Sequence, residues 1–420
     1  MPRRCRVCRQ GEPQQGQFGR GEPNPVQGSL MQSARLAAAV ETPALVIDER
    51  VIEHTLKRAR QICDACGCRL LYSLKPLVCE FVLDLMKPYV DGFAASSLFE
   101  AKLARSVIED AGTVHVTTPG FRAAEIGELD RLCDFVSFNS LGQLRRLGGS
   151  LSSPSKTGLR INPQFPLVAD DRYNPCRAGS KLGVPLDQLK RSLRRSSALL
   201  DGVQGLHFHT NCDSASFEPL LETVEHIESQ LGDWLPRLAW INLGGGYLFD
   251  QDVNQAPLVE AVNRLRVRHG LEVFLEPGAT FVREAGTLIT EVIDLFRSGD
   301  QTIAVLDTTI NHFPEAFEYQ FEPDIRDHDD EGDHEYTLVG STCLAGDLLS
   351  VYAFRKPLKI GSRVVLPDVG AYSLVKAHMF NGVNLPTIYA VTREGALVVR
   401  RRFTYEDFLS RCGAPSDVVV

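Results

Sequence analysis

Apolar and polar positions alternate in short blocks from about residue 68 to residue 280. Eight β-rich blocks recur, at residues 69–75, 91–97, 114–119, 134–140, 157–163, 203–210, 238–246 and 272–278. Between them, segments such as 98–110 and 219–231 place apolar residues with a helical period. Strands that alternate with helices pair in parallel, and eight such units over roughly 200–250 residues have the size of a closed barrel. The sequence therefore predicts an α/β fold with a (β/α)8 TIM barrel over residues 61–285.

The pattern changes after residue 285 to strand-like alternation without helices between the strands. The predicted strands lie at residues 287–296, 302–310, 335–342, 357–368 and 388–399, which is typical of an antiparallel β domain. We expect this domain to cover residues 286–420. Residues 42–49 also have a strand pattern, so we expect residues 31–60 to add a strand to the β domain and to lead into the barrel. Residues 1–30 are rich in Gly, Pro and Gln, a composition that predicts a disordered tail.

Chemically distinctive residues stand at the carboxyl ends of the predicted barrel strands. They include Lys75, Asn139, Arg160, His209 and Glu276. Barrel enzymes place their chemistry at this end of the strands, so we expect an active site there. A doubly wound open sheet is the competing architecture, but no Gly-rich dinucleotide fingerprint follows the first strand.

Composition excludes several classes of function. Lys and Arg total 45 and Asp and Glu total 53, which gives a net charge of −8, so the chain lacks the positive charge that nucleic acid or an anionic membrane surface attracts. The apolar runs are much shorter than the roughly 20 residues of a membrane helix. The basic N-terminus is not followed by an apolar stretch, so we expect no secretory signal. We predict a cytoplasmic enzyme.

The 11 cysteines form two short clusters, Cys5-Cys8 and Cys63-Cys66-Cys68. Together these clusters offer enough thiolates for a zinc site. The first cluster lies in the Gly- and Gln-rich segment, however, and the second ends an amphipathic helix. We therefore expect free thiols and no metal.

Two features of the predicted barrel mouth suggest a cofactor. Lys75 ends a mostly apolar strand, where partial burial would lower its pKa and make its amine nucleophilic; the alternative is a strand-end lysine that reaches water. Three consecutive glycines, Gly244, Gly245 and Gly246, offer bare backbone N–H groups to a phosphate at the seventh strand. The alternative for the glycines is a tight turn that needs positive φ.

Other polar residues leave two interpretations open. Glu276 ends the eighth strand, where a carboxylate either solvates a turn or keeps the nitrogen of a pyridine cofactor protonated. His207 and His209 point to the same side of their strand, which suits either a metal or a cofactor ring; the latter fits better, because the other strand ends lack further His and Asp ligands. In that case one histidine packs on the ring and the other fills the barrel. Cys343, in the second domain, is either a buried thiol or an acid that delivers a proton.

Taken together, these segments resemble the fold-type-III pyridoxal-phosphate decarboxylases, the alanine racemase-like group that contains ornithine and diaminopimelate decarboxylases. The resemblance runs from about Thr42 to the end of the chain. Its motifs are 42-TPALVIDE, 72-YSLKP, 94-AASSLFEAKLA, 158-GLRINP, 173-YNPCRAGSKLGVP, 205-GLHFHTNCD, 242-NLGGGY, 275-LEPG, 306-LDTT, 340-GSTCLAGD and 371-AYSLVKAHMFNG. The Leu-Ala-Gly between Cys343 and Asp347 resembles the carboxynorspermidine decarboxylase branch. Two positions depart from the wider group, Leu344 where an acid is usual and Ala279 where an arginine is usual, so one phosphate contact must come from elsewhere.

The resemblance implies roles for named residues. It implies that Lys75 binds pyridoxal 5'-phosphate covalently, that His209 stacks on the ring, that Glu276 pairs with the pyridine nitrogen and that Arg160 lies near the phenolic edge. The phosphate would be held by Gly244, Gly245, Gly246, Gly278 and Tyr372. Cys343 and Asp347 would act from the other subunit of a head-to-tail homodimer, Cys343 as the proton donor and Asp347 at the amine end of the substrate.

The resemblance implies decarboxylation of carboxynorspermidine or carboxyspermidine to norspermidine or spermidine. A substrate of this kind is a long polycation, so we expect acids along the site, with Asp213 and Glu315 as candidates beside Asp347. Alternatives on the same scaffold are decarboxylation of diaminopimelate, ornithine or another amino acid, and racemisation. A non-catalytic or metal-dependent barrel is a further alternative. We expect no nucleic-acid or membrane partner.

Overall fold

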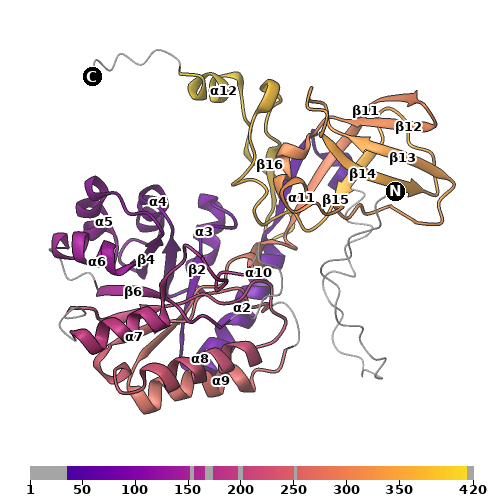
Figure 1. Cartoon of the computed structure of the whole chain (residues 1–420). Coiled ribbons are helices and arrows are strands. Elements are labelled where there is room, and N and C mark those ends of the chain that lie inside the picture. Colours follow the sequence, from indigo (N-terminus) through magenta and orange to yellow (C-terminus); the bar gives the residue numbers. More distant parts are fainter. Residues whose placement is uncertain (1–35, 152–155, 166–173, 197–201, 250–252, 414–420) are drawn as a thin grey trace. The chain divides into compact units, whose positions relative to one another are not determined.

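The computed structural model describes residues 36–151, 156–165, 174–196, 202–249 and 253–413. The chain divides into two units (Figure 1): a central segment, residues 49–285, and a unit formed by the residues before and after it. Residues 1–30, with Cys5 and Cys8, lie outside the described residues. The predicted boundary at residues 60 and 61 is wrong, because it falls inside a helix, α2 (Glu49–Cys66), that belongs entirely to the central unit.

The central unit contains a closed barrel of eight parallel strands. In sheet order they are β2 (Arg69–Ser73), β3 (Gly92–Ala95), β4 (Thr113–Thr118), β5 (Phe135–Phe138), β6 (Lys156–Asn162), β8 (Gly205–His207), β9 (Trp240–Asn242) and β10 (Glu272–Leu275). The pairs β5–β6 and β10–β2 close the ring, and a two-residue strand, β7 (Val184–Pro185), extends from β6. Each of the eight predicted strands overlaps one strand of this ring, so the barrel prediction is confirmed.

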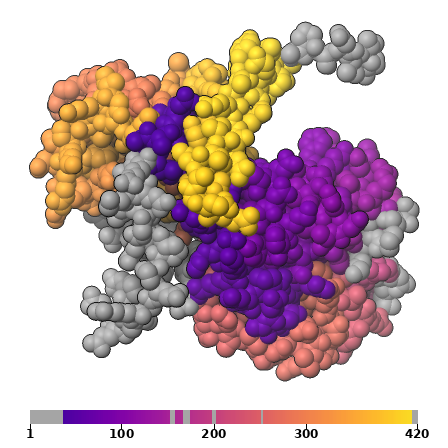
Figure 2. Space-filling view, turned by 180° about the vertical axis from the view of Figure 1, so that it is seen from behind, coloured from indigo at the N-terminus to yellow at the C-terminus, as the bar shows by residue number. Residues whose placement is uncertain are grey.

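Helices cover the outside of the strand ring (Figure 1). After α2 they are α3 (Glu80–Met86), α4 (Leu98–Ile108), α5 (Ile126–Leu132), α6 (Leu141–Leu147), α7 (Leu186–Arg195), α8 (Glu218–Leu231), α9 (Ala256–Asn263) and α10 (Ala279–Val282). Serine starts two of them: the Ser97 side chain accepts from the Glu100 N–H and the Ser140 side chain accepts from the Gln143 N–H, as expected for N-caps. Figure 2 shows the first helix of the barrel, in indigo, beside the last ones, in salmon.

One indole, that of Trp240, belongs to the core cluster inside the barrel. Trp240 is 1% exposed, and its ring lies edge-on to Phe135, with centroids 5.1 Å apart. The neighbouring strands make room for it with glycine: a Cβ at Gly205 would lie 2.1 Å from the indole, and one at Gly158 would lie 2.5 Å from it. Because glycine stands at both positions, a large aromatic side chain packs where smaller residues would leave a void.

The second unit is a mixed sheet rather than a purely antiparallel one. Its strands run in the order β14-β13-β12-β11-β1-β16-β17, and β15 pairs with β11. The pairs β1–β16 and β12–β13 are parallel, and the other five pairs among the described strands are antiparallel. The predicted antiparallel β domain is therefore confirmed as a sheet with mainly antiparallel pairing. The bounds are β1 (Ala44–Asp48), β11 (Gly286–Ser298), β12 (Gln301–Leu306), β13 (His334–Val339), β14 (Leu348–Phe354), β15 (Arg363–Leu366), β16 (Thr387–Val391) and β17 (Leu397–Arg401), with helices α11 (Pro314–Tyr319) and α12 (Tyr405–Arg411).

Strand β1 connects the two units in sequence. It pairs with β11 on one side and with β16 on the other, and Figure 2 shows this indigo segment against yellow C-terminal chain. The chain then enters α2 directly after Asp48. The segment before the barrel is therefore a central strand of the β unit.

Candidate active site

Three strand ends of the barrel are joined by hydrogen bonds around Glu276. The Glu276 carboxylate contacts His207 through one oxygen (Oε1 to Nε2, 2.9 Å) and accepts the Asn242 amide N–H through the other (2.9 Å). Burial raises the pKa of the Glu276 carboxyl, but its contact with His207 and the Asn242 hydrogen bond outweigh this effect and lower the pKa. Glu276 is therefore an ionised carboxylate at neutral pH, with lone pairs left for a further donor.

The triple-glycine turn lies between two neighbouring loops and leaves no room for side chains. A Cβ at Gly244, Gly245 or Gly246 would lie 2.0–2.4 Å from a backbone oxygen of residue 208, 276 or 211, respectively. Gly244 and Gly246 also have φ of +74° and +89°, which favour glycine. The turn therefore has the positive φ that one of the two interpretations of the glycines requires.

The N–H groups of this turn are less open than we expected. Gly244 donates to the side-chain oxygen of Asn242 (2.9 Å), and Gly245 donates to Nδ1 of His209 (3.1 Å). Among the described residues, none accepts from the Gly246 N–H. The expectation of three bare N–H groups is thus wrong for two of them, because side chains of the adjacent strand ends occupy them.

His209 is held in one orientation by the same contact. Because Nδ1 accepts from Gly245, the neutral ring carries its proton on Nε2. Burial, together with the positive charges of Lys75 and Arg160, lowers the pKa of His209 well below its ordinary value. The side chain is therefore a neutral, fixed aromatic ring at the barrel mouth, which suits stacking on a flat cofactor.

Lys75 lies in the turn after β2, close to the loop that carries Glu276. The Ser73 N–H donates to the Pro277 carbonyl (3.1 Å), and a Cβ at Gly278 would lie 2.7 Å from Pro76. The Lys75 side chain is exposed, which corrects the expectation of partial burial: β2 ends at Ser73, so residue 75 has already left the apolar strand. Among the described residues, none forms a hydrogen bond or an ion pair with its amine, so the amine is accessible.

Arg160 is a buried cation near the same carboxylate. It is 9% exposed; burial lowers the pKa of its guanidinium, and the charge of Glu276 opposes this. Within the described part of the chain, no acid forms an ion pair with Arg160, and no acceptor forms a hydrogen bond with its guanidinium. A buried guanidinium with open donors is suited to an anionic oxygen of a bound molecule.

These observations test whether pyridoxal 5'-phosphate fits the barrel mouth. The glycine turn beside Glu276 has no space for a Cβ. The strand ends of the barrel offer an accessible amine, an ionised carboxylate, a fixed neutral imidazole and a buried guanidinium without a partner among the described residues. These are the groups that an aldehyde, a pyridine nitrogen, an aromatic face and a phenolic oxygen require. The residues present therefore fit the cofactor.

The acids expected to bind substrate already have protein partners. Asp213 contacts Arg283 through both oxygens (2.9 and 2.8 Å), and Glu315 lies 3.2 Å from the Lys376 amine in the β unit. Asp347 is 4% exposed and accepts from the backbone of Ile310 (2.7 Å) and from Thr342. This burial departs from the expected contact of Asp347 with substrate, because one oxygen binds Ile310 and the other binds Thr342.

Cys343 and Tyr372 lie in irregular segments of the β unit. Cys343 is exposed, and its N–H donates to the Asn381 side chain (2.9 Å). Tyr372 has φ of +60°, and the Lys376 amine lies 5.5 Å from the centre of its ring. An exposed thiol on an anchored backbone is accessible for proton transfer, and it excludes the buried-thiol alternative for Cys343.

The cysteine cluster at the end of α2 is structural. Gly67 and Cys68 donate backbone N–H groups to the Cys63 carbonyl (2.8 and 3.0 Å), a C-terminal helix motif that brings residues 63 and 68 together. All three thiols are buried; contact with Cys68 and burial raise the pKa of Cys63, and burial raises that of Cys66 to about 12. No set of three or more metal-ligating side chains occurs within the described residues, and no helix there is long and apolar enough to cross a membrane.

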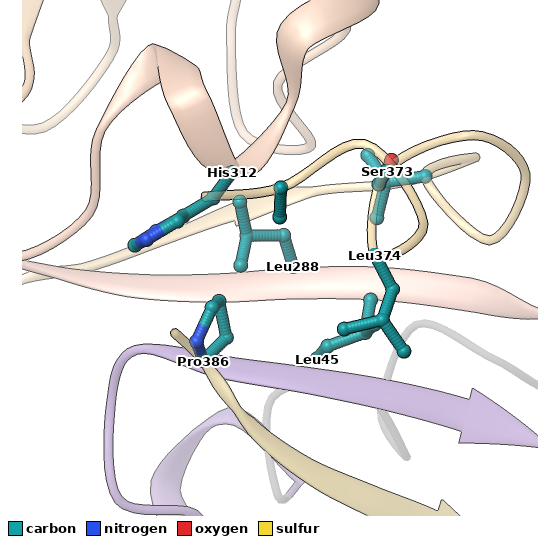
Figure 3. Close-up of a pocket in the computed structure, with 8 residues that line it drawn as sticks. Leu45, Leu288, His312, Ser373, Leu374 and Pro386 are labelled. Atoms are coloured by element: carbon teal, nitrogen blue, oxygen red, sulfur yellow. The ribbon is translucent and has the colours of Figure 1, made fainter. Parts of the chain in front are cut away.

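Two cavities have linings that do not include Glu276 or its hydrogen-bond partners. The first, in the β unit, has a volume of about 10 Å³, room for a single water at most; Figure 3 shows the His312 ring extending away from Ser373 and Leu374. The second, of about 530 Å³, is lined by polar residues at the opposite end of the barrel strands, among them Arg60, Arg69 and Asp91. Neither cavity contains a residue assigned to the cofactor or to substrate.

Comparisons with known proteins give one consistent result. The family described as "Pyridoxal-dependent decarboxylase, C-terminal sheet domain" matches residues 44–370. The chain is 34% identical to a carboxyaminopropylagmatine decarboxylase from Synechocystis (92% of this chain, 98% of the relative) and 32% identical to a carboxynorspermidine/carboxyspermidine decarboxylase from Herminiimonas arsenicoxydans (88% and 99%). It is also similar to the structure of a carboxynorspermidine decarboxylase from Campylobacter jejuni in complex with norspermidine. That structure has a TM-score of 0.79 and 27% identity, with 89% of this chain and all of that chain covered.

Proposed function

Because the chain belongs to the family of pyridoxal-dependent decarboxylases that matches residues 44–370, we propose that it decarboxylates a carboxylated polyamine, carboxynorspermidine or carboxyspermidine, with pyridoxal 5'-phosphate as cofactor. The observation that carries the proposal is the ionised Glu276 carboxylate, fixed by His207 and Asn242 at the barrel mouth. When bound, pyridoxal phosphate supplies an electron-withdrawing ring that accepts the electron pair left when carbon dioxide departs.

The barrel residues act by binding and orienting. Lys75 offers its accessible amine as the covalent attachment point and as the group that the substrate amine displaces. His209 presents its ring face, Arg160 offers donors to the phenolic oxygen, and Glu276 accepts a hydrogen bond from the protonated ring nitrogen. In the proposed site the phosphate lies at the turn of Gly244, Gly245 and Gly246, where the Gly246 N–H is the open donor among the described residues. Gly278 and Tyr372 complete the proposed phosphate contacts.

The β unit contributes the proton donor. Cys343 delivers a proton to the α-carbon after carbon dioxide has left. We place this thiol in the site of a partner subunit in a head-to-tail homodimer. Exposed apolar residues on the β unit support a covered surface there, for example Phe317, Leu344 and Leu348, which are 51%, 37% and 45% exposed.

The substrate class rests on the relatives. The Synechocystis and Herminiimonas relatives are named for substrates that carry a carboxylate on a long cationic chain, and the Campylobacter structure contains norspermidine. The match to the carboxyaminopropylagmatine enzyme supports a second candidate, a substrate whose distal group is a guanidinium. A guanidinium requires a planar, two-point carboxylate contact, whereas an ammonium is a compact point charge. Diaminopimelate carries a second carboxylate, and apolar Leu344 offers no partner for it beside Cys343.

A substrate panel tests the proposal. Purified protein with added pyridoxal phosphate is assayed for carbon dioxide release from carboxynorspermidine, carboxyspermidine, carboxyaminopropylagmatine, diaminopimelate and ornithine. We expect the highest kcat/KM with one of the first two, and a visible absorbance band that borohydride removes. Preference for the guanidino substrate would select the second candidate, and turnover of diaminopimelate or ornithine alone would refute the substrate class.

A further inference from the structure

Three consecutive strands deliver three side chains to one point inside the barrel. His207 ends β8 and pairs in register with Asn242, which ends β9, and Glu276 follows β10. His207 and Asn242 are each 2% exposed, and the Glu276 side chain is 12% exposed. The Glu276 carboxylate is therefore buried against its two protein partners, and its other side remains accessible to a bound molecule.

The orientation of the Asn242 amide is fixed by a second contact. Its oxygen accepts the Gly244 N–H (2.9 Å), so its NH2 group faces the Glu276 carboxylate (2.9 Å). The Glu276 N–H in turn donates to the Gly244 carbonyl (2.8 Å). The side chain of Glu276 and the glycine turn are thus fixed relative to each other through one amide.

The protonation of His207 follows from its surroundings. Its Nε2 faces the Glu276 carboxylate (2.9 Å), and its Nδ1 is buried without a partner among the described residues. A neutral ring with hydrogen on Nε2 donates to the carboxylate and leaves only a lone pair unpaired, whereas a protonated ring would bury an unpaired N–H. Burial lowers the pKa of His207, and the charges of Arg160 and Lys75 add to this, against the opposing effect of Glu276.

We propose that His207 and Asn242 are positioning residues that hold the Glu276 carboxylate in place as a weak base, so that the proton shared with the bound pyridine nitrogen stays on the ring. This inference rests on the proposed function. Neutral donors to a carboxylate stabilise its ionised form, so two of them make Glu276 a good acceptor that does not take the proton. Without them a buried carboxylate would become more basic and would draw the proton away, leaving a ring that withdraws electrons less well.

The alternative role for His207 is to fill the barrel. A matched control exists in His115, which is also buried in a barrel strand (5% exposed) and stacks on Phe135 at 4.1 Å. His207→Phe removes the donor and keeps a ring, His207→Gln keeps an N–H of similar reach, and His115→Phe removes an imidazole elsewhere. A filling role predicts similar effects of the two phenylalanine variants.

The main measurement is the ¹⁵N chemical shift of the ring nitrogen of bound, labelled pyridoxal phosphate. We expect a protonated nitrogen in the wild type, in His207→Gln and in His115→Phe, and a shift toward the unprotonated value in His207→Phe, with kcat reduced at least about tenfold and KM changed less. A wild-type shift in His207→Phe would overturn the inference. Failure of the wild type to bind the cofactor would instead refute the proposed function, so the two failures are distinguishable.

A second measurement covers the case in which His207→Phe does not fold. In the apoprotein, ¹⁵N spectra of the histidines, with His207→Gln for assignment, report which ring nitrogen carries hydrogen. We expect His207 to remain neutral with hydrogen on Nε2 throughout the neutral pH range. Hydrogen on Nδ1, or a protonated ring at neutral pH, would contradict the proposal without any unstable variant.

Discussion

Replacing Gly205 with alanine tests whether the packing around Trp240 is as tight as the structure indicates. The new Cβ would lie 2.1 Å from two indole carbons, against an ordinary contact of at least 3.4 Å, so the atoms must separate by about 1.3 Å. The indole cannot retreat from Gly205 freely, because Gly158 and Phe135 lie against the same ring. Overpacking of this kind costs about 1–3 kcal/mol or more, and we expect about 3 kcal/mol here.

The sign of the effect makes this a sharp test. Where alanine fits, replacing glycine stabilises a protein by roughly 0.4–1 kcal/mol, because it restricts the unfolded chain. Gly127→Ala in α5 is the matched control, since nothing lies within 4 Å of its Cβ position, and we expect it to be neutral or stabilising. The free energy of unfolding is measured in urea by tryptophan fluorescence, to which Trp240 is one of two contributors.

A double variant separates the contact from other effects. In Gly205→Ala/Trp240→Leu the smaller side chain leaves space for the methyl group. The double variant should therefore lose less stability than the sum of the two single variants, by at least about 1 kcal/mol. A Gly205→Ala protein as stable as the wild type, or strictly additive losses, would refute the packing argument.

Further predictions concern the site and its pH dependence. Lys75→Ala should abolish turnover and covalent attachment of the cofactor, which is measured by mass spectrometry after borohydride reduction. A visible absorbance band that persists in the variant and that borohydride removes would assign the cofactor to another lysine. Cys343→Ala should lower kcat by at least about a hundredfold with little change in cofactor affinity, and mixing it with Lys75→Ala should restore part of the activity if sites are shared between subunits; no recovery would argue against sharing. Burial lowers the pKa of His312 to about 4 from 6.5, and nearby Asp347 opposes this, so the unfolded chain binds the proton first as pH falls. The stability that this group contributes is therefore complete above pH 6.5 and is lost as the pH falls to 4, by up to about 3 kcal/mol. Urea unfolding at several pH values should show that the free energies of unfolding of the wild type and His312→Asn approach each other as the pH falls. A difference that stays constant with pH would contradict the prediction.

The barrel and most of its mouth could be predicted from the sequence because the signals are local. A polar residue or a glycine follows the apolar run at each strand end; Arg160 and Glu276 are examples. The partner of an acid is not local: Asp213 contacts Arg283, 70 residues away, and Glu315 contacts Lys376, 61 residues away. Alternation of residues also does not distinguish parallel from antiparallel pairing in the β unit.

The sequence pattern does not single out Asn242, although its amide donates to the Glu276 carboxylate. It ends its strand directly before Leu243 and the glycines, and its position in register with His207 follows once the barrel order is known. A polar residue at the last position of an otherwise buried strand is the signal that could have identified it. His207 was expected to fill the barrel, and only the structure shows its contact with Glu276.

The path of the chain through β1 has a consequence for synthesis on the ribosome. The barrel is one uninterrupted stretch, residues 49–285, whereas β1 needs β16, which begins at Thr387. Domains generally fold as units while the chain emerges, so the barrel has all its strands available more than a hundred residues before β1 can complete its second ladder. A nascent chain halted before Thr387 would therefore expose one edge of β1 to aggregation, while its barrel had already formed.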